Sequence, residues 1–183
     1  MESIAEVAIA GRSNAGKSSA LNALTGRRKL ARVSKTPGRT RLINFFEIDR
    51  NTFLVDLPGY GYAQVPGEMK RQWAQLLTGY LNQRRQICGL MVVMDVRHPM
   101  TPLDQQLLSW FAATGKPVHV LLTKADKLSR SQAATQLRKV ETTLRKDYPG
   151  CSAQLFSSSG KLGVLDAQAV IRGWLTTARQ TGA

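Results

Sequence analysis

The chain has little of what marks secreted, metal-binding or membrane-spanning proteins. It contains only two cysteines, Cys88 and Cys151, and their spacing matches no metal motif, so we expect neither a disulfide framework nor a Cys/His metal site. No run of about eighteen apolar residues occurs, which argues against a transmembrane helix. The first residues lack the basic start of a secretory signal. We therefore expect a cytoplasmic protein without stable membrane association.

Acidic residues are also scarce. The chain has 26 Lys and Arg against 12 Asp and Glu, which gives a net charge of +14. No acid lies between Glu6 and Glu47, whereas that interval holds nine basic residues. They are Arg12, Lys17, Arg27, Arg28, Lys29, Arg32, Lys35, Arg39 and Arg41. Such an excess can serve solubility alone, but a balanced surface would do the same, so we predict a polyanionic partner, with nucleic acid as the first candidate.

One motif is complete. Residues 11–18 read GRSNAGKS and match G-x-x-x-x-G-K-[ST]. A strand-like segment at 4–10 precedes them and a helical pattern at 18–25 follows, the context in which backbone N–H groups wrap a polyphosphate at a helix N-terminus. We expect Lys17 to contact the terminal phosphates and Ser18 to ligate Mg²⁺. The alternative, an ordinary glycine-rich turn, does not account for this context. The predicted contacts of this loop are Gly11, Arg12, Ser13, Asn14, Ala15, Gly16, Lys17, Ser18 and Ser19.

Strand-like and helical segments alternate along the chain. The predicted strands are 4–10, 41–48, 52–57, 88–94, 117–122 and 153–156. The predicted helices are 18–25, 68–84, 102–113, 129–147 and 165–178, with N-caps at Thr101 and at Ser129 or Ser131. A turn signal at 49–51 joins two strands as a hairpin. This order predicts one α/β domain over 1–183, with a mainly parallel six-stranded sheet, one antiparallel strand and helices on both faces.

A D-x-x-G motif ends the strand predicted at 52–57, at the edge of the sheet where ligands of such folds bind. Its residues are Asp56, Leu57, Pro58 and Gly59. Asp56 would hold Mg²⁺ through water, and the Gly59 N–H would sense a γ-phosphate. The alternative is a Pro-Gly turn without a ligand.

A threonine before the strand predicted at 41–48 would complete the magnesium site. Thr40 and Thr36 compete for this role, and we favour Thr40 because Pro37-Gly38 redirect the chain after Thr36 and the strand begins directly after Thr40. The residues expected near the nucleotide in this segment are Gly38, Arg39, Thr40, Arg41 and Leu42.

A second polar motif follows the strand predicted at 117–122. Thr123, Lys124, Ala125 and Asp126 are similar to the guanine-reading N-K-x-D element. A carboxylate at Asp126 can accept the N1–H and the 2-amino hydrogen of guanine, a donor pair that adenine lacks. The aliphatic stem of Lys124 can cover the base. After the last strand, the loop whose backbone would contact the guanine oxygen contains Phe156, Ser157 and Ser158.

In this order, the motifs resemble a translation-factor-type GTPase. The individual residues in and around these motifs are similar to the EngB (YihA/YsxC) family of bacterial GTP-binding proteins over nearly the whole chain. The segments that carry the resemblance are GRSNAGKSS at 11–19, SKTPGRT at 34–40, LINFF at 42–46, DLPGYGYA at 56–63, DVRHP at 95–99 and LTKADKL at 122–128. The resemblance implies a P-loop GTPase fold (G domain), GTP/GDP with Mg²⁺, and a role in assembling the large (50S) ribosomal subunit, linked to cell division and septation. Thr at position 123 is the form that this family uses.

Residues near the phosphates bear on the rate of hydrolysis. Tyr60 stands where a regulatory GTPase usually has the water-orienting Gln, so we expect slow intrinsic hydrolysis. Asn14 has two interpretations, which stay open: it holds K⁺ against the phosphates, or it only tolerates a left-handed turn. The predicted catalytic residues are Lys17, Thr40 and Asn14, and the predicted metal ligands are Ser18, Thr40 and Asp56.

The expected partner is rRNA of the large subunit or its precursor, bound by a monomer whose first switch carries the basic run. Two other classes remain. One is a small kinase, which would not need Asp126 and would be separated by nucleotide competition. The other is a GTPase of the membrane or division machinery, for which the sequence offers neither a basic amphipathic helix nor a lipidation signal.

Overall fold

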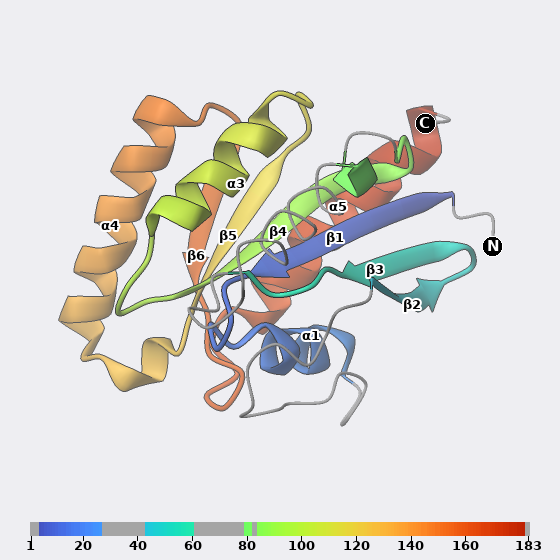
Figure 1. The fold of residues 1–183 in the computed structure, drawn as a ribbon. Coiled ribbons are helices and arrows are strands. Elements are labelled where there is room, and N and C mark those ends of the chain that lie inside the picture. Colours follow the sequence, from blue (N-terminus) through green and yellow to red (C-terminus); the bar gives the residue numbers. More distant parts are fainter. Residues whose placement is uncertain (1–3, 27–42, 61–78, 82–83, 182–183) are drawn as a thin grey trace.

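The computed structural model describes residues 4–26, 43–60, 79–81 and 84–181. They form a six-stranded sheet in the order β2-β3-β1-β4-β5-β6, with helices on both faces (Figure 1). The strands are β1 (Ala5–Gly11), β2 (Asn44–Asp49), β3 (Thr52–Asp56), β4 (Ile87–Asp95), β5 (Val118–Thr123) and β6 (Cys151–Leu155). The helices are α1 (Lys17–Thr25), α3 (Pro102–Ala112), α4 (Arg130–Asp147) and α5 (Val164–Thr181), with a 3₁₀ turn, η1 (Ala125–Lys127).

The pairing of the strands confirms the predicted fold class. β1 pairs in parallel with β3 and β4, and β4, β5 and β6 continue the parallel part of the sheet. Only β2 runs antiparallel among the strands described, joined to β3 by the short turn that contains Asn51 with a φ of 54°. The carboxyl ends of β1, β3, β4 and β5 therefore meet at one edge, where their following loops converge.

Two apolar cores lie on opposite faces of the sheet because successive residues of each strand point to opposite sides. Val7 and Ile9 of β1 belong to the core that α1 and α5 cover. Ala8 and Ala10 of the same strand belong to the core that α3 and α4 cover. The phosphate-loop strand is thus buried on both faces, and it fixes the loop that follows it.

The predicted caps are confirmed. Thr101 caps α3, and Ser129, rather than Ser131, caps α4; each forms a reciprocal capping box with the residue three positions later. The strand predicted at 41–48 is wrong at its start, because β2 begins at Asn44 and Ile43 lies outside it. Arg41 and Leu42 are outside the described residues.

The last strand begins two residues earlier than predicted, at Cys151, which pairs with Val118. The turn signal of Pro149 and Gly150 placed Cys151 and Ser152 outside the predicted strand. In the structure, Ser152 and Gln154 flank the buried His119, whose Nδ1 lies 2.7 Å from the Ser152 hydroxyl and whose Nε2 lies 2.8 Å from the Gln154 side chain. Burial lowers the pKa of His119.

The helix predicted at 68–84 lies mostly outside the described residues. Residues 79–81 are helical, but Arg84 is not, so the helix ends earlier than predicted. Its end is attached to the sheet by Glu6, a fully buried carboxylate of β1. The Tyr80 hydroxyl donates to Glu6 at 2.5 Å and the Arg84 guanidinium donates at 2.8 Å.

Candidate nucleotide-binding site

The predicted phosphate loop connects β1 to α1 and depends on residues that accept unusual backbone conformations. Gly16 and Asn14 both have left-handed backbones, with φ of 92° and 64°. A Cβ at Gly11 would lie 2.8 Å from the Val93 carbonyl oxygen, so β1 can approach β4 this closely only because residue 11 is glycine. The backbone path of this loop therefore depends on Gly11, Asn14 and Gly16.

The residues of the D-x-x-G motif run alongside this loop. Leu57 donates its N–H to the Ile9 carbonyl at 2.9 Å, which continues the pairing of β3 with β1. Tyr60 donates its N–H to the Gly11 carbonyl at 3.3 Å and accepts the Ser13 N–H at 2.7 Å. The chain after β3 is thus hydrogen-bonded to the phosphate loop itself.

The charged groups of the two motifs meet directly. The Lys17 ammonium forms an ion pair with the Asp56 carboxylate, and both residues are buried, with 9% and 3% of their surface exposed. Ser18 follows Lys17 in the first turn of α1. A hydroxyl from Ser18 and a carboxylate from Asp56 are oxygen ligands of the kind that Mg²⁺ takes beside substrate phosphates. These described residues fit a magnesium ion between the loop and the end of β3.

At the base end of the site, Thr123 connects β5 to the phosphate loop. Its hydroxyl is buried within hydrogen-bonding distance of the Ala15 carbonyl and 3.0 Å from the Met94 carbonyl. Threonine, in the place of the usual Asn, thereby joins the guanine-reading motif to the loop that would hold the phosphates.

Lys124 spans the same two segments. It has a left-handed backbone with a φ of 58°, and its ammonium donates to the Asn14 carbonyl at 2.7 Å. A second contact, at 2.9 Å, is with Asp95, which also binds Arg97 at 2.6 Å. Burial acts to raise the pKa of Asp95, but hydrogen bonds from Arg97 and Lys124 outweigh it and hold the pKa well below its usual range. An ionised Asp95 therefore fixes the lysine over the loop.

Asp126 lies in η1, exposed to solvent, and is oriented by the loop after β6. The Ser157 hydroxyl donates to its carboxylate at 2.6 Å, and this hydrogen bond lowers the pKa of Asp126. Backbone bonds hold the two loops together, since Ala125 donates its N–H to the Phe156 carbonyl at 3.1 Å. Asp126 thus presents an ionised acceptor group at the sheet edge.

Comparison with known proteins shows to which family this chain belongs. The family described as 50S ribosome-binding GTPase matches residues 6–124. "Probable GTP-binding protein EngB" of Thiobacillus denitrificans is 60% identical over 93% of this chain and 82% of its own length, and its namesake in Nitrosomonas europaea is 55% identical over 94% and 78%. The chain belongs to the EngB family of GTP-binding proteins. GTP binding and hydrolysis follow in general terms from membership of this GTPase family.

Solved structures agree on the fold. A crystal structure described as a probable EngB covers 94% of this chain and 100% of its own, with a TM-score of 0.74 and 21% identity. An Era variant from Aquifex aeolicus bound to GDP and AlF₄⁻ covers 92% of this chain and 56% of its own, with a TM-score of 0.73 and 19% identity. At these identities the likeness shows the fold alone.

Two residues that orient the site of this EngB-family chain were not predicted to do so. Asp95 was known only as part of the DVRHP segment, and Ser157 only as part of a loop that offers its backbone. Their carboxylate and hydroxyl hold Lys124 and Asp126 in place. A buried acid directly after an apolar strand was the available signal for Asp95, whereas Ser157, in the turn-like Ser-Ser-Ser-Gly run, offered none.

The remaining predicted residues divide into two groups. Ser19 lies in α1, and Pro58, Gly59 and Ser158 lie in the loops after β3 and β6, at the same edge of the sheet. Those that fall outside the described residues are Thr36, Gly38, Arg39, Thr40, Arg41 and Leu42.

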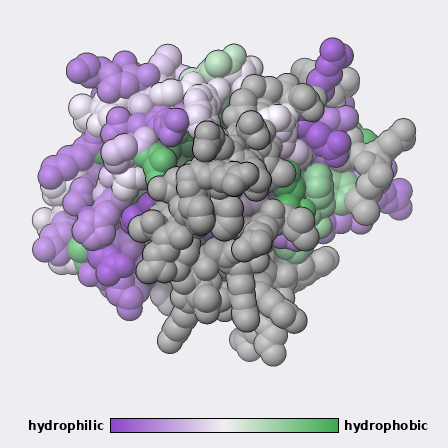
Figure 2. Space-filling view, in the orientation of Figure 1, coloured by the Kyte–Doolittle hydropathy of each residue, from purple (hydrophilic) through white to green (hydrophobic). Residues whose placement is uncertain are grey.

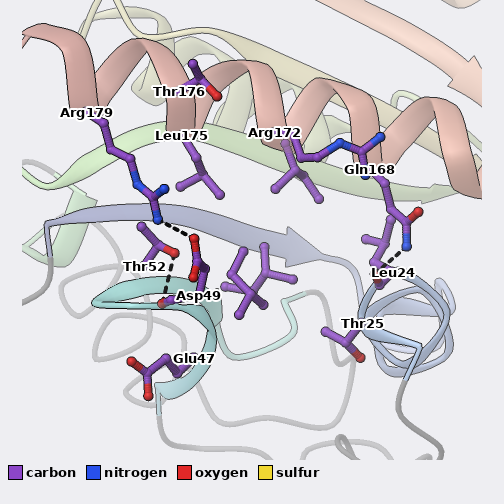
Figure 3. Close-up of a pocket in the computed structure, with 13 residues that line it drawn as sticks. Leu24, Thr25, Glu47, Asp49, Thr52, Gln168, Arg172, Leu175, Thr176 and Arg179 are labelled. Carbon is purple, nitrogen blue, oxygen red and sulfur yellow. Dashed lines mark hydrogen bonds and ion pairs between the residues drawn. The ribbon is translucent and has the colours of Figure 1, made fainter.

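A groove of about 450 Å³ lies elsewhere, between α5, the β2–β3 hairpin and the end of α1 (Figure 3). Arg179 of α5 binds Asp49 of the hairpin at 2.6 Å, and Gln168 donates to the Leu24 carbonyl at 2.8 Å. Thr52, at the amino end of β3, lines the groove, whereas Asp56 stands at the opposite end of that strand. The groove is therefore separate from the candidate nucleotide site. No helix in the described part of the chain is long and apolar enough to cross a membrane.

Proposed function

We propose that this chain is a single-domain, monomeric GTPase switch that binds the large ribosomal subunit or its precursor and acts in its assembly, with cell division dependent on that role. The observation that carries the proposal is the convergence of the phosphate loop, D-x-x-G and Thr-Lys-Ala-Asp at one edge of the sheet, in a chain of net charge +14. The description of the matching family as ribosome-binding supports the partner.

In this proposal each group at the phosphate end has one role. The loop N–H groups and the Lys17 ammonium would bind the phosphates, while Ser18, Thr40 and Asp56 would hold Mg²⁺. The metal would neutralise charge that develops between the β- and γ-phosphates. Gly59 offers its N–H to the γ-phosphate, so the chain from Gly59 onward distinguishes GTP from GDP.

Hydrolysis by the protein alone should be slow. The residue after Gly59 is Tyr60, which is 3% exposed and packs in the core that α3 and α4 cover. It therefore offers no side-chain amide of the kind with which Gln orients the attacking water. Without a group that orients the attacking water, activation must come from outside the residues described, by K⁺ or by the partner.

The partner surface that we propose includes the outer face of α4. Val140 and Leu144 bury the inner face of this helix. The opposite face exposes Arg138, Lys139, Arg145 and Lys146. Within the described parts of the chain, no ion pair joins these four residues to an acid. Figure 2 shows hydrophilic residues over the flank where Figure 1 places α4. Unpaired cations on a fixed helix suit a phosphate backbone.

A second basic segment, Arg27 to Arg41, falls entirely outside the described residues. We propose that it contacts the same RNA in a nucleotide-dependent way, since it precedes β2 in the first switch. The face on α4 belongs to the scaffold and should contribute equally with GTP or GDP bound.

Co-sedimentation with large ribosomal subunits over a series of salt concentrations tests both surfaces. Two triple variants are compared, R27A/R28A/K29A and R138A/K139A/K146A, each with a GTP analogue and with GDP. Each should flatten the salt dependence by up to about three units, since each lost phosphate contact removes about one. Only the first should also alter the difference between the two nucleotides.

The matched control is R50A/R85A/R172A, which removes the same charge from exposed positions elsewhere and should leave the salt slope unchanged. If both test variants pellet like the wild type at every salt concentration, the RNA contact lies elsewhere. Binding to anionic liposomes in place of ribosomal particles would instead favour the membrane or division machinery.

A further inference from the structure

The side chain of Tyr60 reaches from the D-x-x-G loop to α3. Its hydroxyl donates to the Asp104 carboxylate at 2.7 Å, across 44 positions of sequence. Both residues are almost wholly buried, with 3% and 1% of their surface exposed. Burial and the neighbouring carboxylate raise the pKa of Tyr60 well above its usual value, so the hydroxyl stays protonated and remains a donor. Neither side chain has a place in the nucleotide chemistry described above.

Asp104 is itself held rigidly. It is the third residue of α3 and half of the capping box, in which its other oxygen accepts the Thr101 N–H at 2.8 Å and the Thr101 hydroxyl at 2.8 Å. A carboxylate near a helix N-terminus is also favoured by the helix dipole. Asp104 is therefore a fixed acceptor, supplied by an element that belongs to the core of the fold.

Tyr60 is consequently fixed at both ends. Its backbone pairs with Gly11 and Ser13 of the phosphate loop, and its hydroxyl is bound to α3. Gly59, immediately before it, has the phosphate loop close by: a Cβ built at Gly59 would lie 3.6 Å from the Gly11 carbonyl oxygen. The direction of the Gly59 N–H thus depends on where Tyr60 is held.

We propose that Asp104 is a positioning residue for the γ-phosphate: through Tyr60 it holds Gly59 in the orientation that discriminates GTP from GDP. The inference rests on the proposed function, because it takes Gly59 as the γ-phosphate sensor. It adds that α3, through the bond between Asp104 and Tyr60, fixes the position of the D-x-x-G loop. Restricting a loop to its binding conformation raises affinity by reducing the ordering cost of binding.

Tyr60→Phe and Asp104→Asn test the proposal, with affinities for GDP and for a non-hydrolysable GTP analogue measured side by side. Each variant should lower the ratio of GTP-analogue affinity to GDP affinity by about tenfold, the effect of one hydrogen bond to a charged group. GDP affinity itself should stay near that of the wild type. The double variant should be no worse than the more impaired single variant, since both act on the same contact: Tyr60→Phe removes its donor and Asp104→Asn removes the charge of its acceptor.

Ser109→Ala is the matched control. It removes an exposed hydroxyl that donates to the Gln105 carbonyl within α3, and it leaves the capping box and the Tyr60–Asp104 contact in place. It should leave the ratio of affinities unchanged. Tyr60→Phe removes a single oxygen, so the test stands even if Asp104→Asn fails to fold.

An unchanged ratio in Tyr60→Phe overturns the inference, as does an equal change in Ser109→Ala. Either result leaves the proposed function intact, provided that GDP and the analogue still bind. Loss of all guanine-nucleotide binding by the wild-type protein would instead overturn the proposed function.

Discussion

The phosphate end and the base end of the candidate site are built in opposite ways. At the phosphate end, the functional side chains are buried and bound to each other, as in the Lys17–Asp56 ion pair. At the base end, Asp126 is exposed, and the residue that orients it, Ser157, is the buried one. At the phosphate end the functional groups bind each other, whereas at the base end a buried residue orients an exposed functional group.

This difference assigns different roles to the two ends. For Lys17 to bind phosphates it must exchange the Asp56 carboxylate for them, so nucleotide binding is coupled to separation of this ion pair. Asp126 already has its ionised form and its orientation, so base recognition needs little change. We expect the phosphate end to report the nucleotide state and the base end to supply constant affinity for guanine.

The largest effect should follow from removing the charge at the phosphate end. Lys17→Ala should weaken GTP and GDP binding by about 100-fold or more, because the cation that we propose for the phosphates is lost and the Asp56 carboxylate loses its partner. Titration with a fluorescent nucleotide measures this loss, and the melting temperature shows whether the fold persists.

Lys139→Ala removes the same charge from the exposed face of α4 and serves as the control for Lys17→Ala. It should bind both nucleotides like the wild type. Normal affinity in Lys17→Ala would mean that the loop at 11–18 is not the phosphate site.

At the base end, Asp126→Asn should change which base is bound. An amide offers one acceptor and one donor where guanine needs two acceptors, so GDP affinity should fall by about 100-fold, and xanthosine diphosphate should gain. Asp147→Asn, an exposed acid at the end of α4, is the control for charge. If Asp126→Asn binds GDP as tightly as the wild type, the guanine assignment is wrong.

The same contrast explains how far the sequence alone could lead. Lys17 lies at the start of α1 and Asp56 at the end of β3, where the loop motif and the strand periodicity predict them. Their roles toward a nucleotide stay predictions. Thr123 looked like a departure from the usual Asn, yet its hydroxyl connects β5 to the phosphate loop. Its partner, the Ala15 carbonyl, is 108 positions away, so nothing local indicates the contact.

Supporting residues were missed for the same reason. Ser157 acts through its side chain on a residue of another loop, and Tyr60 acts, as we propose, through α3. β6 was placed late because Pro149 and Gly150 mark a turn, and nothing local shows that Ser152 bonds to His119 on the neighbouring strand. Long-range hydrogen bonds have no sequence period, so pattern alone could not reveal them.

The smallest effect that we predict concerns Asn14, where the two ends meet. Its carbonyl binds Lys124 of the base end, while its side chain is exposed in the phosphate loop. The left-handed backbone, with a φ of 64°, supports the structural interpretation of this residue, and a role in holding K⁺ remains compatible with it. Hydrolysis measured in matched KCl and NaCl separates the two.

Asn14→Gly keeps the left-handed backbone free of strain and removes the side chain, whereas Asn14→Ala removes the side chain and adds strain. If Asn14 holds K⁺, the wild type should turn over GTP faster in KCl than in NaCl, and both variants should lose that difference. If only the backbone matters, Asn14→Gly should behave like the wild type in both salts. Asn14→Ala alone should then weaken guanine-nucleotide binding, because a shifted Asn14 carbonyl no longer holds Lys124 in place. Equal rates in both salts for all three proteins would remove K⁺ from the mechanism. The role of Asn14 would then be structural: its carbonyl accepts the Lys124 ammonium and so connects the phosphate loop to that lysine.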